Sequence, residues 1–203
     1  MLYSTSFFAP IPYFQSIAKH KAIVIDLNEL YKKQTWRNRA QILESNGPMY
    51  LTVPVIRPNG SQSIVKEVRV CYKTDWRKDH WMAIVSSYQH APYFFYYGEQ
   101  IRELIYHEEP ILYKYNDTIF RQLLKWLDLD IEVSFSEQYH SPIDKSDYRI
   151  YLDKKNFDIE QERYIQVFSD KMPFYPNLSI LDLLLNEGPL ARKRLTSNKQ
   201  EIK

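Results

Sequence analysis

One run of eight residues, Lys32-Lys33-Gln34-Thr35-Trp36-Arg37-Asn38-Arg39, combines four cations with two amides and an indole. An extended backbone from Arg37 onward would place Arg37 and Arg39 on one face. Trp36 and Asn38 would then point to the opposite face. Two guanidiniums on one face offer fixed, permanently charged donors that suit a carboxylate or a phosphate. The alternative interpretation is a solvated edge strand whose charges discourage pairing with other strands.

His80 is the candidate for proton transfer. It lies one turn after Trp76 and one turn before Ile84 on a predicted helix over residues 76–90, so its ring is expected to face partly inward. Burial there would lower its pKa and keep it neutral near pH 7, the state that a general base requires. The alternative is a core histidine whose nitrogens are satisfied by packing neighbours. The five histidines are scattered without metal-ligand spacing, and we expect no metal site.

The composition is typical of a folded protein with a large aromatic content. The chain has 203 residues with 17 Tyr, 10 Phe and 4 Trp, which is enough for one domain with a substantial core. A net charge of +2 is too small to indicate nucleic-acid binding by bulk electrostatics. Only four glycines are present, and no glycine-rich phosphate loop can be recognised, so no cofactor is expected. A small molecule or a sugar nucleotide is the expected ligand.

Other features bear on the compartment. Cys71 is the single cysteine, so an internal disulfide is excluded. No apolar stretch has the length of a membrane span, and no signal peptide is recognised at the N-terminus. We therefore expect a cytoplasmic protein.

The N-terminal residues predict a strand–helix–strand unit. Leu2–Phe8 and Ala22–Leu27 have the composition of strands, and Tyr13–His20 has the apolar spacing of a helix. Such a unit normally makes two parallel strands with a right-handed crossover. In parallel sheets the binding sites lie beyond the carboxyl ends of the strands, here at Phe7–Pro10 and Asp26–Asn28.

The middle of the chain adds strands, and helices follow. The Asn46-Gly47 pair predicts a hairpin between strands over residues 38–43 and 49–56, and residues 64–72 predict a further strand. Helices are expected over residues 98–106, 115–127 and 180–185, with a late strand over residues 131–135. The predicted fold class is α/β, a crossover unit extended into a mixed sheet with flanking helices. Residues 1–195 are expected to form one domain, and residues 196–203 a disordered charged tail.

Several separated motifs resemble, in the same order, the WbqC-like family, and the likeness covers about Leu2 to Ala191. The motifs are Phe8-Ala9-Pro10-Ile11-Pro12-Tyr13-Phe14, Lys33-Gln34-Thr35-Trp36-Arg37-Asn38-Arg39, Leu51-Thr52-Val53-Pro54-Val55, His80-Trp81, Ser87-Tyr88, Ala91-Pro92-Tyr93-Phe94, Tyr115-Asn116, Tyr164-Ile165-Gln166-Val167-Phe168 and Asn177-Leu178-Ser179-Ile180-Leu181-Asp182-Leu183-Leu184. The resemblance implies a protein of surface-polysaccharide (O-antigen) gene clusters, suggested to transfer glycine or a similar acyl group to a sugar. Many members carry a Gln-Pro-Tyr or Pro-His-Tyr sequence near the N-terminus, where this chain has Ser6-Phe7-Phe8.

Two classes of function follow. The first is a group transferase acting on a sugar nucleotide or glycan precursor, in which Arg37 and Arg39 hold an anionic group, Asn38 orients it and His80 is the general base. The second is a non-catalytic ligand-binding or scaffold protein of the same pathway. The candidate substrate-binding residues are Lys33, Trp36, Arg37, Asn38, Arg39, Tyr88 and Asn116.

Overall fold

The structure, a computed structural model, describes residues 1–141, 147–149 and 161–197. It begins with strand β1 (Leu2–Ser4), helix α1 (Ile11–Ile17) and strand β2 (Ala22–Asp26). Strands β1 and β2 pair in parallel. A proline in the first turn of α1 suits the helix start because its fixed φ is already helical. The predicted crossover unit and the α/β class are confirmed.

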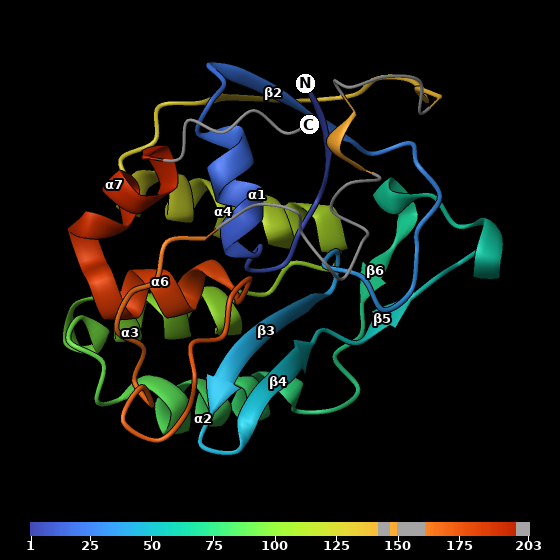
Figure 1. Ribbon diagram of the computed structural model, residues 1–203. Helices are drawn as coiled ribbons and strands as arrows, with labels where there is room; N and C mark the ends of the chain where they lie inside the picture. The colour runs from blue at the N-terminus through green and yellow to red at the C-terminus, as the bar shows by residue number, and fades with distance from the viewer. Residues whose placement is uncertain (142–146, 150–160, 198–203) are drawn as a thin grey trace.

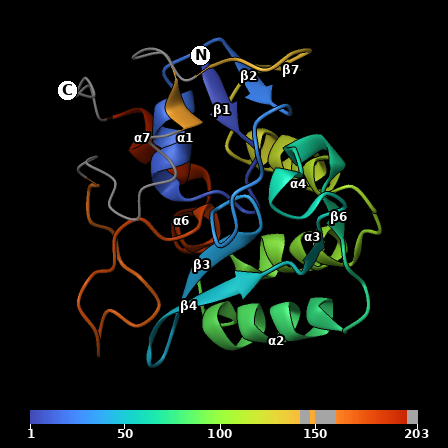
Figure 2. The same cartoon turned by 90° about the vertical axis from the view of Figure 1, so that its right-hand side faces the viewer.

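The third strand of this sheet comes from much later in the chain. Strand β7 (Glu132–Phe135) pairs in parallel with β2, with Ala22 opposite Glu132, so the strand order is β1-β2-β7. All three strands run in the same direction, and their carboxyl ends therefore lie at one edge. Figure 1 and Figure 2 place this sheet at one end of the molecule and helix α2 (Trp76–Tyr88) at the other.

The middle strands form two antiparallel pairs beside the parallel sheet. Strand β3 (Arg39–Glu44) and strand β4 (Gly47–Thr52) make the predicted hairpin, and Gly47 has the positive φ of 115° that its turn needs. Strand β5 (Val55–Ile56) pairs with strand β6 (Arg69–Val70). The strand expected over residues 64–72 is limited to β6, because Val65–Glu67 forms a short 3-10 helix.

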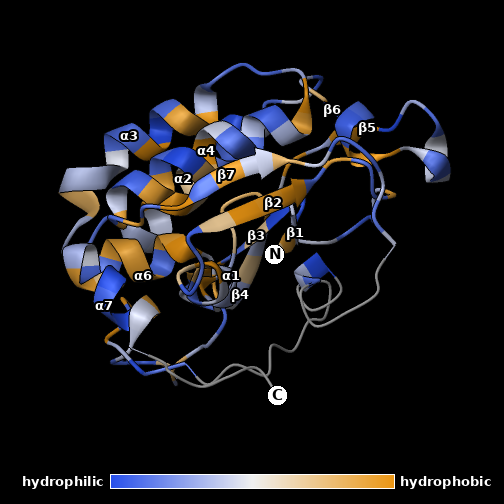
Figure 3. Cartoon of the chain, turned by 90° about the horizontal axis from the view of Figure 1, so that it is seen from above, coloured by the Kyte–Doolittle hydropathy of each residue, from blue (hydrophilic) through white to orange (hydrophobic). Residues whose placement is uncertain are grey.

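The helices enclose a single hydrophobic core. After α2 come helices α3 (Phe94–Tyr106), α4 (Leu112–Trp126), α6 (Ile180–Glu187) and α7 (Ala191–Thr196). The core cluster draws residues from Tyr3 to Leu195, and Figure 3 shows that β2 is apolar over most of its length. In the described part of the chain, no helix combines the length and apolar character needed to cross a membrane. The predicted tail begins at the last residue of α7, and residues 198–203 lie outside the described residues.

Candidate functional site

A small recess lies just beyond the carboxyl ends of the three parallel strands. Its volume is about 10 Å³, the space of about one water molecule. Ligand sites of parallel α/β sheets are expected at this edge. The lining residues come from the strand ends, from α1 and from α4: Thr5, Ser6, Tyr13, Ile25, Tyr113, Asn116, Asp117, Phe120 and Phe135.

Asn116 connects the recess to the rest of the site. Its side chain is buried in α4, and Nδ2 donates to Thr5 Oγ1 at 3.2 Å and to the Arg37 carbonyl oxygen at 2.8 Å. Its Oδ1 has no hydrogen-bond partner among the described residues. A buried acceptor without a partner is costly, so this atom is suited to receive a hydrogen bond from a ligand or a water.

The segment that follows β1 forms one wall of the site, and it is buried throughout. Thr5, Ser6 and Phe7 are each at most 8 % exposed. The Trp36 carbonyl accepts hydrogen bonds from Phe7 N at 2.9 Å and from Ser6 Oγ at 3.1 Å. Phe8 has a φ of 37°, a strained conformation for a bulky residue that surrounding contacts must impose. The wall is therefore held in a fixed shape.

Asp26, the last residue of β2, supports the same edge from inside. Its buried carboxylate accepts hydrogen bonds from Ser136 Oγ at 2.6 Å and from Asn28 N at 2.9 Å, and it pairs with Arg149. Arg149 also pairs with Asp147. The carboxylates of Asp147 and, to a smaller extent, of Asp26 raise the pKa of the Arg149 guanidinium. Since Asp26 is fully buried and bonded within the protein, it serves to position the strand ends.

The Arg37 side chain is buried, and its guanidinium donates hydrogen bonds to other side chains of the protein. Its Nε and Nη2 donate to the two carboxylate oxygens of Glu29 at 3.0 and 2.7 Å. Further hydrogen bonds reach Ser4 Oγ at 2.7 Å and Thr35 Oγ1 at 3.1 Å. Strand β3 begins only at Arg39, and Arg37 lies in a turn, so the extended backbone that would place Arg37 and Arg39 on one face is not present. The alternation that would pair it with Arg39 on one face does not apply.

The other residues of the basic run spread over different environments. Lys33 is exposed in the turn, and Trp36 is half-buried, with its ring 6.2 Å from that of Tyr50. Asn38 is buried and donates from Nδ2 to the Val53 carbonyl at 2.8 Å. The Arg39 guanidinium lies over the Tyr50 ring, 5.6 Å from its centre.

His80 is buried as its helical spacing predicts. Its ring centre lies 5.0 Å from that of Trp76 and 5.8 Å from that of Phe7. Burial lowers the pKa of His80 to about 4, against the opposing effects of a hydrogen bond with the Thr52 backbone and of the Asp79 charge. The imidazole is therefore neutral at pH 7. His80 does not line the recess.

Tyr88 is fully buried beside Leu43, near the end of β3 that leads into the hairpin turn. Its hydroxyl donates to Asp182 Oδ1 at 3.0 Å and accepts from Leu43 N at 3.1 Å. Asp182 also accepts hydrogen bonds from Tyr164 and from Gln166, and burial raises the pKa of its carboxyl. This network joins α2, β3 and α6, and the structure does not bring Tyr88 to the recess.

Of the substrate-binding residues expected from the sequence, Asn116 lines the recess, and the Arg37 carbonyl accepts a hydrogen bond from Asn116 Nδ2. Residues that sequence reasoning missed are Thr5, Ser6, Tyr13 and Asp117. Thr5 and Ser6 follow the carboxyl end of β1, which stops at Ser4. The predicted strand over Leu2–Phe8 is too long and includes both residues, so the expected site was placed further along the chain, at Phe7–Pro10. Asp117 had no signal beyond its place next to Asn116.

Comparison with known proteins identifies the class. The sequence model of the WbqC-like protein family matches residues 5–168, and the chain belongs to this family. The chain is 26 % identical over 207 residues to a protein of Mycobacterium tuberculosis described as "Uncharacterized protein Rv1507c", covering 87 % of this chain and 88 % of the relative. No solved structure matches.

Proposed function

We propose that the protein transfers a glycyl or similar acyl group to a sugar or sugar-nucleotide precursor of a surface polysaccharide. The resemblance to the WbqC-like family supports the proposal, and the recess beyond the parallel strands carries it. Its lining includes Asn116, whose buried amide oxygen has no hydrogen-bond partner in the described part of the chain, the carboxylate residue Asp117, and several aromatic rings. Aromatic walls with a few placed polar groups are typical of sites for small ring-shaped ligands.

The volume of the recess limits what it can hold. At about 10 Å³ it admits one substituent, such as a hydroxyl or an amino group, and the rest of a sugar would lie at its mouth. Asn116 Oδ1 would accept a hydrogen bond from that substituent. The recess thus selects the acceptor group.

Asp117 is our candidate for the proton acceptor. The amine or hydroxyl of the sugar would attack the carbonyl carbon of the acyl donor, forming a C–N or C–O bond while the bond to the leaving group breaks. The attacking group releases its proton to the Asp117 carboxylate, and the leaving group departs with the bonding electron pair. Arg121 Nε donates to Asp117 Oδ2 at 2.8 Å and orients the carboxylate.

His80 is the base that the sequence predicts, and its neutral ring meets one requirement of that role. Its ring lies against those of Phe7 and Trp76, and His80 is not among the residues that line the recess. A variant of each candidate base distinguishes the two roles.

A second candidate function is ligand binding without catalysis. The internal use of Arg37 favours it, because the transferase hypothesis assigned this guanidinium to an anionic group of the substrate, whereas it pairs with Glu29. Binding without transfer would be the signature of this function.

Binding is tested by calorimetric titration of the full chain with UDP-, GDP- and dTDP-linked sugars. We expect one group of these ligands to bind, and Asn116→Leu to weaken that binding about tenfold, the effect of one good hydrogen bond. Gln122→Leu, on the same helix and outside the recess, is the matched control. Equal affinity in folded Asn116→Leu protein would contradict the role of the recess.

Transfer is tested by incubating the bound sugar nucleotide with activated glycyl and acetyl donors. The product is detected by mass spectrometry as a sugar nucleotide heavier by one acyl group. We expect Asp117→Asn to lower turnover about hundredfold or more, and the exposed control Asp130→Asn to leave it unchanged. Loss of turnover in His80→Gln with full activity in Asp117→Asn would return the role to His80.

A further inference from the structure

Four aromatic rings line the recess, two from α4 and one each from α1 and β7. Tyr13 and Phe120 meet edge to face, with ring centres 5.8 Å apart and ring planes at 82°. Tyr113 and Phe135 meet in the same way, with ring centres 5.7 Å apart and ring planes at 72°. The faces of aromatic rings are electron-rich, and rings gathered around one small space are an arrangement that proteins use to hold ammonium groups.

The polar side chains of the lining supply hydrogen-bond acceptors. The hydroxyls of Ser6 and Tyr13 each donate to a backbone carbonyl at 3.1 Å, so their remaining capacity is to accept. Asn116 Nδ2 makes two hydrogen bonds, and Oδ1 of the same amide has no partner among the described residues. The hydroxyls of Thr5 and Tyr113 can donate or accept. Each of these five groups can therefore accept a hydrogen bond from a ligand.

Asp117 adds a negative charge to the lining. Its side chain is 22 % exposed, and Arg121 Nε donates to its Oδ2 at 2.8 Å. Because the Arg121 side chain is itself 52 % exposed, this ion pair is weak, and the carboxylate still attracts a second cation. Among the described residues that line the recess there is no lysine, arginine or histidine. The charge at the recess therefore favours a cationic ligand group.

The size of the recess limits this cation to a small one. Its volume of about 10 Å³ is the space of one water molecule, which a primary ammonium resembles in size and a quaternary ammonium exceeds. An ammonium has three donors and no acceptor, and it therefore matches a lining whose polar groups can all accept. Tyr113 and Asp117 lie one turn apart on α4 and are only half-buried, so a ligand can approach the recess from their side.

We infer that the recess binds a primary ammonium group, held by the Asp117 carboxylate, the Asn116 amide oxygen and the aromatic rings. The inference rests on the proposed function, and it names the group that occupies the recess. Two substrates of that reaction can carry this group: an amino sugar as the acceptor, or a glycyl donor with a free amine. A hydroxyl in the same place would lose the attraction of the carboxylate and of the rings, so the recess selects an amine over a hydroxyl.

Binding is tested by NMR titration of the isotope-labelled full chain at about pH 6.5, where such amines are protonated. The probes are glucosamine, which carries the ammonium on a sugar, glycinamide, which carries it on a glycyl group, and glucose, which carries none. We expect at least one amine to bind about tenfold or more tightly than glucose, the effect of one charge-assisted hydrogen bond. Preference for glucosamine would assign the ammonium to the sugar acceptor, and preference for glycinamide would assign it to the glycyl donor.

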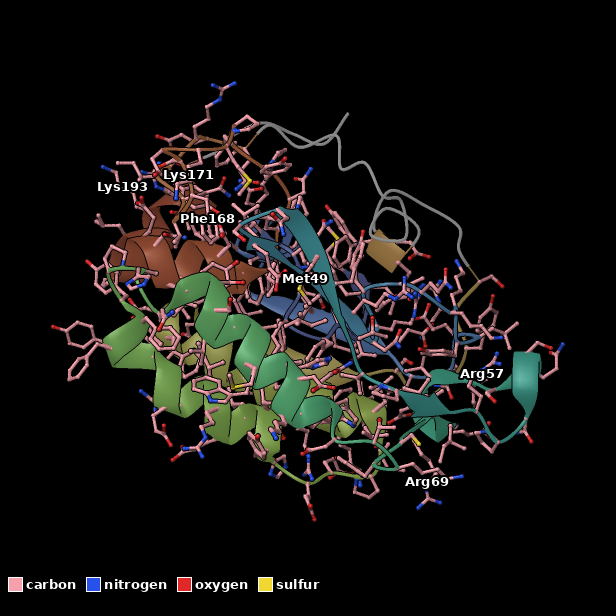
Figure 4. The ribbon with its side chains drawn as sticks, turned by 90° about the horizontal axis from the view of Figure 1, so that it is seen from below. Met49, Arg57, Arg69, Phe168, Lys171 and Lys193 are labelled. Carbon is pink, nitrogen blue, oxygen red and sulfur yellow. The ribbon has the colours of Figure 1, made fainter. Side chains whose placement is uncertain are left out.

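Two variants test the groups that hold the ammonium. Asp117→Asn keeps the shape of the side chain and removes its charge, and it should weaken binding of the amine about tenfold. Tyr113→Leu removes one ring and should weaken that binding about threefold. The controls are Asp130→Asn, an exposed carboxylate between α4 and β7, and Lys193→Gln, an exposed lysine of α7 at the outer edge of the molecule in Figure 4. Both control variants should bind the amine as the wild type does.

Equal affinity for glucose and for both amines, or no binding of either amine, would overturn the inference. Amine binding that Asp117→Asn and Tyr113→Leu leave unchanged would overturn it as well. Acyl transfer that prefers neither an amino sugar nor a glycyl donor would reject the ammonium site and leave the proposed function intact. Amine binding that depends on Asp117, in a protein that transfers no acyl group, would support the ammonium site and contradict the transferase.

Discussion

The carboxylate of Glu29 and the guanidinium of Arg37 face each other inside the protein and form two hydrogen bonds, of 3.0 and 2.7 Å. Both side chains are almost fully buried, at 8 and 1 % exposure. A buried ion pair of this kind fixes geometry, and the loss of one partner leaves the other charge buried and uncompensated. The pair ties the basic turn to the segment that follows β2.

Glu29→Gln should therefore lower the free energy of unfolding by about 3–5 kcal/mol, because the buried Arg37 charge loses the Glu29 carboxylate. Urea denaturation monitored by circular dichroism measures the change. The control is Glu99→Gln, which breaks the exposed Glu99–Arg102 pair and should cost less than about 1 kcal/mol. Equal costs in the two variants would show that the buried pair has no special weight.

The N-terminal unit could be predicted because its signals are local. The apolar run at Ala22–Asp26 and the helical stripe of α1 each need only neighbouring residues to be recognised, and the Asn46-Gly47 pair marks its own turn. The pairing of β2 with β7 joins residues about a hundred positions apart, and no local pattern indicates it. The sequence predicted that the hairpin strands extend the parallel sheet into a mixed sheet. Among the described residues, β3 and β4 instead form a two-stranded sheet of their own.

In the candidate site, too, some features have local sequence signals and others depend on residues far apart in the chain. The sequence indicated the carboxyl edge of the parallel strands, where the recess lies, and it indicated Asn116, which lines that recess. It did not indicate that Arg37 lies in a turn, where strand alternation does not apply, nor that Glu29 would take its guanidinium. The chemistry of a guanidinium depends on its spatial partners, and spacing along the chain does not report them.

Gly188 should be irreplaceable at the end of α6. Its φ is 53°, and a Cβ there would lie 2.4 Å from the Tyr93 ring. Gly188→Ala thus combines left-handed strain with a clash, and we expect a loss of about 3 kcal/mol or more. Gly60→Ala is the matched control, since Gly60 has a φ of 57° with nothing within 4 Å of the added atom. It should cost only about 1–2 kcal/mol, from strain alone. Thermal melts of both variants test this, and similar losses would refute the clash.

Tyr88→Phe should destabilise the junction of α2, β3 and α6. The change removes the hydroxyl that donates to Asp182 and accepts from Leu43 N, so two buried groups each lose a partner. We expect a loss of about 2–4 kcal/mol in urea denaturation. Tyr96→Phe, at an exposed position of α3, should change stability by less than about 0.5 kcal/mol. A Tyr88→Phe protein of wild-type stability would mean that the network carries little free energy.

His80 should make the protein less stable in acid. The folded protein takes up its proton only near pH 4 because the ring is buried, whereas an unfolded chain takes it up near the ordinary value of 6.5. Between these two pH values the unfolded state binds more protons, so the free energy of unfolding falls as the pH falls. The contribution of His80 between pH 7.5 and pH 4.5 is about 2.5 kcal/mol. Gln at this position does not titrate, and the loss of stability over the same interval should therefore be smaller in His80→Gln by about that amount.

Urea denaturation of the wild type and of His80→Gln at both pH values measures the two differences. Ile84→Val, a buried change one turn further along α2, should keep the wild-type difference because it removes no titrating group. An unchanged difference in folded His80→Gln protein would show that His80 takes up its proton equally well in the folded and unfolded states.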